Sequence, residues 1–103
     1  MFSNSITATK ICQEILSYIR AEKGEYSSWY VGVTSNPHIR LFQEHNVEVN
    51  NSWWVISKAI NPEEARLVEK TLIEVNGMDG GSGGRDDKSV YVYAYKKTKT
   101  TIP

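Results

Sequence analysis

The sequence predicts a small α/β domain of the α+β kind, in which a mainly antiparallel three-stranded sheet is flanked by helices in the order α-β-α-β-α-β. Some segments repeat apolar residues at helical spacing. Others alternate between the two faces of a strand or are continuously apolar, as buried strands are. Two Asn-Pro pairs precede segments that are expected to be helical. A chain of 103 residues has the size of one domain. We therefore expect one domain over residues 1–103, with its core at residues 28–96.

Three helices are predicted. The segment 7–23 repeats apolar side chains every three or four residues. The other two follow an Asn-Pro pair, which supplies an N-cap and a first helical residue of fitting geometry. These helices are expected at residues 37–46 and 62–76.

Three strands are predicted, at residues 28–34, 53–59 and 89–96. Because the first two are long, apolar and separated by a helix, we expect them to pair directly in an antiparallel sheet. The glycine-rich residues 77–84 predict a flexible loop. Residues 97–103 are expected to form a frayed basic tail.

Composition indicates a soluble, cytoplasmic protein. The chain is 40% hydrophobic and 23% charged, close to the globular average. It has no apolar stretch of the roughly 20 residues that span a bilayer, and its N-terminus is not that of a signal peptide. The single cysteine, Cys12, excludes an internal disulfide. The net charge is zero, so any attraction to nucleic acid must be local.

One segment carries residues suited to phosphate chemistry. The predicted strand presents the hydroxyl of Tyr30, the bare backbone of Gly32 and the side chain of Thr34 on one face. One turn into the next helix, Arg40 has the planar guanidinium that suits bidentate phosphate binding. His45 lies further along. Taken singly, each residue also has an ordinary interpretation as a packing, capping or solvated side chain.

This segment resembles the second half of the GIY-YIG endonuclease signature. The family pattern has a Tyr-[Ile/Val]-Gly strand and an arginine ten residues after the tyrosine, a separation that Tyr30 and Arg40 match. In the structure-selective branch a Gln-His-Asn follows. This chain has Gln-Glu-His-Asn at residues 43–46, with one inserted residue.

Two further features are similar to the same family. A later helix carries its catalytic glutamate between an alanine and a Leu-Ile pair, and Glu69 has these neighbours. A carboxylate at the border of an apolar face costs free energy unless it is paired or bound to metal. Residues 85–91 are similar to the stretch after the nuclease core of bacterial excision-repair incision subunits. The resemblance covers residues 28–95.

The resemblance implies hydrolysis of phosphodiester bonds in nucleic acid, DNA rather than RNA, with Mg²⁺ or Mn²⁺ held by Glu69. Arg40 would clamp the scissile phosphate, and His45 would shuttle a proton. Tyr30, with Tyr26, would position or deprotonate the attacking water. Tyr30, Arg40 and Glu69 are then expected to open into one cleft within about 10 Å. The expected substrate-binding residues are Gly32, Thr34, Arg85 and Lys88.

Two departures from the family keep other functions open. The opening Gly-Ile-Tyr strand has no clean counterpart, and a glycine-rich loop replaces an asparagine expected after the glutamate helix. These departures favour a catalytically degenerate module that binds nucleic acid or protein on the same scaffold. A third hypothesis is a structural domain with an aromatic partner surface, made of Trp53, Trp54, Tyr91, Tyr93 and Tyr95. The endonuclease is the preferred hypothesis, and the oligomeric state stays open.

Overall fold

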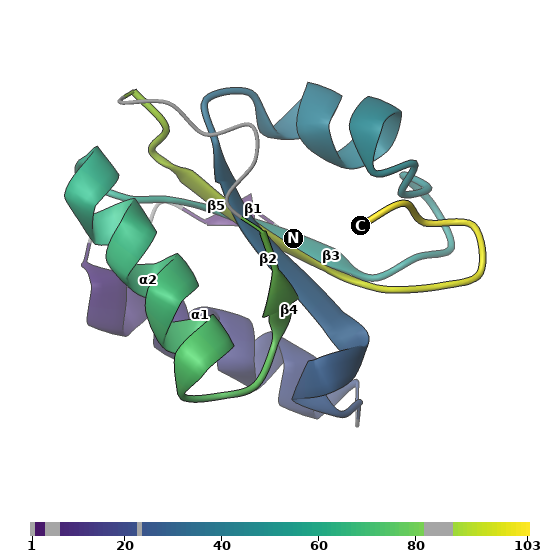
Figure 1. The fold of residues 1–103 in the computed structure, drawn as a ribbon, viewed down its shortest axis with the longest axis horizontal. Helices are drawn as coiled ribbons and strands as arrows, with labels where there is room; N and C mark the ends of the chain where they lie inside the picture. Colours follow the sequence, from purple (N-terminus) through teal and green to yellow (C-terminus); the bar gives the residue numbers. More distant parts are fainter. Residues whose placement is uncertain (1, 4–6, 23, 82–87) are drawn as a thin grey trace.

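The computed structural model describes residues 2–3, 7–22, 24–81 and 88–103, and it confirms a mixed α/β domain. The helices α1 (Ala8–Ala21) and α2 (Pro62–Glu74) cover one face of a sheet, and a helical segment at residues 37–44 covers the other (Figure 1). The domain therefore has three layers, with the sheet in the middle.

Within the described residues the sheet has five strands, in the order β1-β3-β5-β2-β4. Its three long strands are antiparallel neighbours, with β5 (Tyr91–Lys96) between β3 (Trp54–Lys58) and β2 (Trp29–Thr34). Two-residue strands extend the edges in parallel: β1 (Phe2–Ser3) beside β3, and β4 (Asp79–Gly80) beside β2. The expected three-stranded antiparallel sheet is thus the centre of a larger mixed sheet, and the expected element order lacks the two edge strands.

The predicted pairing of strand 28–34 with strand 53–59 is wrong. Tyr93 of β5 lies opposite Gly32 on one side and opposite Ile56 on the other. Both faces of β5 are buried, because helices cover both sides of the sheet, and the strand is suited to this because valine and alanine alternate with tyrosine along it. Alternation predicts the faces of a strand, but it does not identify the neighbour.

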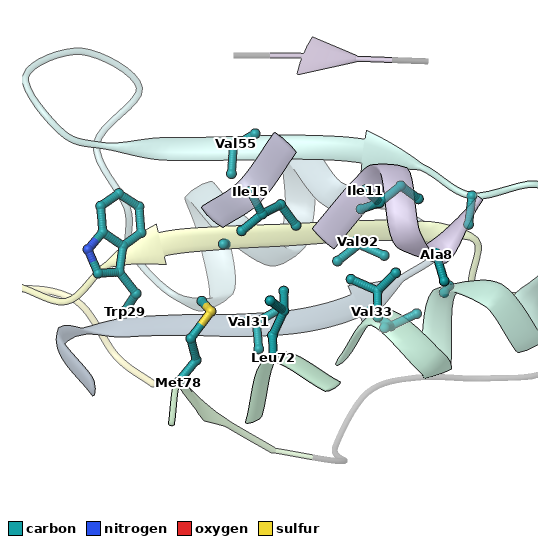
Figure 2. Packing of buried hydrophobic residues seen from close by; sticks show 14 of the residues in the cluster. Ala8, Ile11, Ile15, Trp29, Val31, Val33, Val55, Leu72, Met78 and Val92 are labelled. Atoms are coloured by element: carbon teal, nitrogen blue, oxygen red, sulfur yellow. The ribbon is translucent and has the colours of Figure 1, made fainter. Parts of the chain in front are cut away.

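The main core lies between the sheet and the two long helices (Figure 2). Every second residue of β2 and β5 points into it, as the alternation predicts. Cys12 packs against this core, and burial raises the pKa of its thiol, consistent with a structural role. The residues that fill this core include Ile11, Ile15, Ile19, Trp29, Val31, Val33, Val55, Val68, Leu72, Val92 and Ala94.

Local signals in the sequence fix the ends of α2. Asn61 is the N-cap, and its side chain accepts a hydrogen bond from the Glu64 backbone N–H at 2.8 Å. At the other end Gly77 has a φ of 79°, a left-handed conformation that favours glycine. The Gly77 N–H donates to the Ile73 carbonyl at 3.2 Å and the Met78 N–H donates to the Leu72 carbonyl at 3.1 Å, so the last carbonyls of the helix are satisfied by the turn around this glycine.

The segment 97–103 is ordered by hydrogen bonds, contrary to the frayed tail expected. The Lys97 N–H donates to the Ser28 carbonyl at 2.9 Å, and the Ile102 N–H donates to the His45 carbonyl at 2.8 Å. In Figure 1 this yellow segment turns back past the end of β5 and returns beside the helical segment. Its backbone groups pair with partners far away in the sequence, which composition does not reveal.

Over the part of the chain that the structure describes, every helix is too short or too polar to traverse a lipid bilayer.

Candidate functional site

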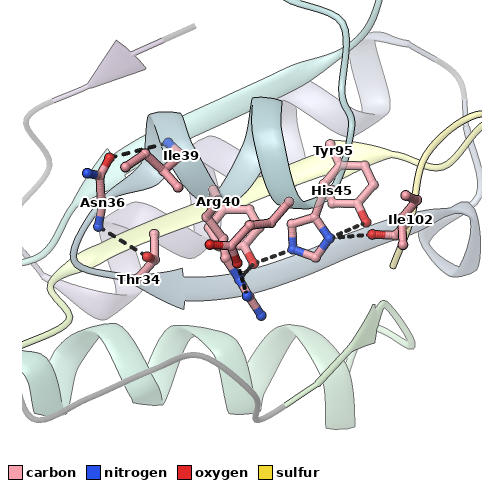
Figure 3. A network of polar contacts seen from close by, with 9 residues as sticks. Thr34, Asn36, Ile39, Arg40, His45, Tyr95 and Ile102 are labelled. Carbon is pink, nitrogen blue, oxygen red and sulfur yellow. Dashed lines mark hydrogen bonds and ion pairs between the residues drawn. The ribbon is translucent and has the colours of Figure 1, made fainter.

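The hydroxyl of Tyr93 is the meeting point of two side chains from the helical segment. It lies 2.7 Å from Nε2 of His45 and 3.3 Å from Nε of Arg40. Figure 3 shows Arg40 and His45 reaching from this segment toward the strands below. Tyr30 and Tyr95 pack against the same imidazole ring. We call these five residues the Tyr93 cluster.

A π-helix aligns Arg40 with His45. Residues Ile39–Glu44 have π-helical geometry, and the His45 N–H donates to the Arg40 carbonyl five residues earlier at 2.9 Å. In an α-helix five residues cover about 1.4 turns and would point apart. An i→i+5 hydrogen bond brings them to the same side of the helix instead. The helix expected at residues 37–46 is therefore π-helical over most of its length.

His45 is buried, with 3% of its surface exposed. Its Nδ1 atom lies 2.6 Å from the Ile102 carbonyl oxygen and 3.1 Å from the Tyr95 hydroxyl. Burial lowers the pKa of the imidazole, and the nearby Arg40 lowers it further, although the contact with Ile102 acts the other way. His45 is therefore neutral at pH 7.

Tyr30 interacts both with the Tyr93 cluster and with Glu69 of α2. It lies opposite Tyr95 in the register of β2 and β5, and the two rings stack with centroids 5.3 Å apart. Burial raises the pKa of its hydroxyl, while Arg40 and a backbone hydrogen bond with Gly81 lower it. The carboxylate of Glu69 raises it, so Glu69 and Arg40 both act electrostatically on this hydroxyl.

Glu69 is a buried acid in α2, with 4% of its surface exposed. It lines a pocket of about 470 Å³ together with Gly81, the residue that hydrogen-bonds Tyr30. Glu69 also contributes to the raised pKa of Tyr93. Glu69 thus acts electrostatically on the Tyr30 and Tyr93 hydroxyls, but the residues that line its pocket include none of Tyr30, Arg40 and His45, and both Tyr30 and Glu69 are buried. The remaining lining residues are Arg66, Lys70, Ile73, Glu74 and Gly80.

Three predicted site residues have other positions or roles. Tyr26 packs against the core on the α1 and α2 face, which is the face of the sheet opposite to the Tyr93 cluster. The hydroxyl of Thr34 accepts a hydrogen bond from the Asn36 N–H at 3.1 Å, so it closes the turn into the helical segment (Figure 3). The space above Gly32 is filled by the Tyr93 ring, not by a ligand.

The two basic residues expected to contact substrate lie at the end of the glycine-rich stretch. Lys88 is exposed, in the turn before β5. Arg85 lies outside the described residues.

Sequence reasoning missed Tyr93, Tyr95 and Ile102 as members of this site. The three alternating tyrosines of β5 indicated a strand face or an aromatic partner surface, but Tyr93 and Tyr95 are buried and cannot contribute to such a surface. Tyr93 lies 53 positions from Arg40 in the sequence, and only the pairing of β5 with β2 brings the two together.

A divalent metal would have one buried carboxylate donor in this pocket, since Glu74, which also lines it, is exposed. Among the described residues there is no group of three or more histidine, cysteine, aspartate or glutamate side chains that could hold an ion. Mg²⁺ keeps several waters and is often bound through one or two carboxylates plus substrate phosphates. A single buried glutamate on a pocket with room for water fits that mode, with Glu69 as the protein ligand.

Comparisons with protein-family models, curated proteins and solved structures gave no match. The function of this domain is therefore inferred from its own residues and from the resemblance to the GIY-YIG signature.

Proposed function

We propose that this domain is a metal-dependent endonuclease that hydrolyses phosphodiester bonds in nucleic acid. The observation that carries the proposal is the meeting of Arg40 and His45 on the Tyr93 hydroxyl, beside Tyr30. Glu69, the expected metal ligand, acts electrostatically on both tyrosine hydroxyls. These contacts and electrostatic effects support the proposal.

Tyr93 supports the proposal because it would supply the tyrosine that the sequence lacks. The resemblance expects a second tyrosine, on a strand that precedes Tyr30. β5 carries one beside β2, although it comes at the other end of the sequence. The absence of an opening Gly-Ile-Tyr strand therefore does not by itself favour a degenerate site.

Each side chain has a role that its environment suits. The Arg40 guanidinium, partly exposed and anchored through Nε on Tyr93, would hold the scissile phosphate. Neutral His45 would accept a hydrogen bond from the Tyr93 hydroxyl and hold it in place beside Arg40, and Tyr30 would orient the attacking water. A divalent ion bound at Glu69 would supply charge stabilisation for the phosphate and the leaving oxygen.

One set of observations favours the degenerate binding module as the second candidate. Tyr30, His45 and Glu69 are buried, and Arg40 forms an ion pair with Glu44 on its own helix. A substrate phosphate would have to displace that carboxylate. Because such an i,i+4 pair near the surface contributes only about 0.3–0.5 kcal/mol, its displacement costs little.

The test is cleavage of branched and single-stranded DNA by the purified protein with Mg²⁺ or Mn²⁺. We expect cutting that stops in chelator and is abolished by Glu69→Gln, which removes the metal ligand but keeps the side-chain volume. Arg40→Ala should lower the rate by roughly a hundredfold, the scale for one electrostatic donor. Glu63→Gln, an exposed acid in the first turn of the same helix, is the matched control and should cut normally.

Two results would contradict the proposal in different ways. Cutting that survives Glu69→Gln refutes the site assignment. Wild-type protein that binds these substrates and cuts none of them supports the degenerate module.

A further inference from the structure

The geometry points to the segment 97–103 as a positioning element of the site. We infer that the main chain of Ile102 fixes the ring of His45 with its proton on Nδ1, and thereby sets the direction of the hydrogen bond between Tyr93 and His45. The proposed function assigns no role to this segment.

Ile102 holds His45 at two points. Its N–H donates to the His45 carbonyl at 2.8 Å, and its own carbonyl oxygen lies 2.6 Å from the ring atom Nδ1. Ile102 is 59% exposed, and both contacts are made by its main chain. Two bonds in opposite directions fix both the backbone and the ring of His45.

The carbonyl partner decides which ring nitrogen carries the proton. A carbonyl oxygen accepts and never donates, so Nδ1 must be the donor. A neutral imidazole has one N–H, which leaves Nε2 as an acceptor. The Tyr95 hydroxyl, 3.1 Å from the same Nδ1, accepts a share of that hydrogen bond.

The direction of the next two hydrogen bonds follows. Because Nε2 accepts, the Tyr93 hydroxyl must donate to it over 2.7 Å. Arg40 has only donors, so its Nε–H donates to the Tyr93 oxygen at 3.3 Å. The three hydrogen bonds therefore all donate in the same direction, from Arg40 to Tyr93, from Tyr93 to His45 and from His45 to Ile102. If the proton of the His45 ring were on Nε2 instead, that atom would donate to the Tyr93 oxygen and could not accept a hydrogen bond from its hydroxyl.

A small threonine network holds the segment in this position. The Thr98 N–H donates to Oγ1 of Thr101 at 2.9 Å, and that hydroxyl donates back to the Thr98 carbonyl at 3.1 Å. The Asn46 side chain donates to the Thr100 carbonyl at 3.0 Å, which ties the segment to the residue after His45. Side-chain hydroxyls thus fix a contact that the main chain makes.

The test measures the tautomer by the ¹⁵N chemical shifts of the imidazole rings at pH 7.5. The chain has two histidines, and the exposed His38 serves as an internal reference. Two variants loosen the segment: Thr98→Ala with Thr101→Ala, and replacement of residues 98–103 by glycine and serine. The matched control is Ile102→Ala, which keeps the main-chain contact.

We expect wild type and Ile102→Ala to hold His45 as the Nδ1–H tautomer, and both loosened variants to show a mixture of tautomers while His38 is unchanged. The inference is overturned if wild-type His45 is protonated on Nε2, or if a folded glycine–serine variant keeps the wild-type tautomer.

The role of this positioning in catalysis rests on the proposed function, but the tautomer does not. A protein that never cuts, yet shows the expected shifts, would refute the nuclease and leave the positioning role of Ile102 standing. Normal cutting by the glycine–serine variant with a changed tautomer would separate the segment from catalysis and overturn its role in the site.

Discussion

Gly32 and Tyr93 are opposite each other in the sheet, and the tyrosine lies across the glycine. A Cβ atom added at Gly32 would stand 2.3 Å from the Tyr93 hydroxyl oxygen and 2.5 Å from the ring carbon that bears it. The glycine is therefore needed for a contact within the protein. Its lack of a side chain allows the ring to lie flat enough for the hydroxyl to reach both Arg40 and His45.

Gly32→Ala should destabilise the fold, by about 1–3 kcal/mol, because the ring must leave its position. Chemical denaturation gives the free energy of unfolding. The same change in a Tyr93→Ala background removes the clash and should cost less than half as much. Equal costs in the two backgrounds would show that the ring does not depend on the glycine.

Tyr93→Phe should destabilise the protein by about 1–3 kcal/mol, since it removes the hydroxyl that partners both the buried His45 and Arg40. Tyr91→Phe on the same strand is the control, because that ring is partly exposed and its stacking under Lys58 does not need the hydroxyl. We expect the control within about 0.5 kcal/mol of wild type. A larger loss for Tyr91→Phe than for Tyr93→Phe would contradict the cluster described above.

His45 should make stability depend on pH below about 6.5, the ordinary pKa of histidine. Its pKa is lowered in the folded state, so the unfolded state binds the proton more readily. The contribution of neutral His45 is complete above pH 6.5 and is lost as the pH falls toward the folded pKa. The groups that face the ring are Arg40 and Glu44 from its own segment, Tyr93 and Tyr95 from β5, and Tyr30 from β2.

The measurement is the free energy of unfolding at several pH values between about 7.5 and 5, a range that includes the ordinary histidine pKa of about 6.5. His45→Asn should flatten the decline, and His38→Asn should leave it unchanged because His38 is exposed. A decline that persists in His45→Asn would assign it to other groups.

Binding to nucleic acid should weaken with salt if a few cations contact phosphates. Because the net charge is zero, the slope of the logarithm of the binding constant against the logarithm of the salt concentration reports on local contacts such as those of Arg40 and Lys88. Removing one cation that binds a phosphate should lower the logarithmic slope by about 0.7 to 0.9. Fluorescence anisotropy with Arg40→Ala and Lys88→Ala, against Lys10→Ala on the outer side of α1, measures this. Binding that is insensitive to salt would indicate an aromatic surface and a protein partner.

The sequence by itself determined the long helices and strands and their faces, but not the two short edge strands. The helix starts at Asn36 and Asn61 were predicted from local chemistry, and both side chains accept the expected hydrogen bonds. Alternation correctly divided β2 and β5 into two faces, because side chains of a strand point alternately to opposite sides. Arg40, which follows Tyr30 by ten residues, acts electrostatically on the Tyr30 hydroxyl and lowers its pKa against the effect of burial.

Only the tertiary structure decided how these elements combine. The insertion of β5 between β2 and β3, and with it the contact of Tyr93 with Arg40 and His45, depends on pairing between segments that are far apart in the sequence. The contact of Ile102 with His45 is made by main-chain atoms, which every residue has. Such contacts do not depend on the identity of the side chains. The sequence therefore predicted a frayed tail, whereas in the fold this segment packs against His45.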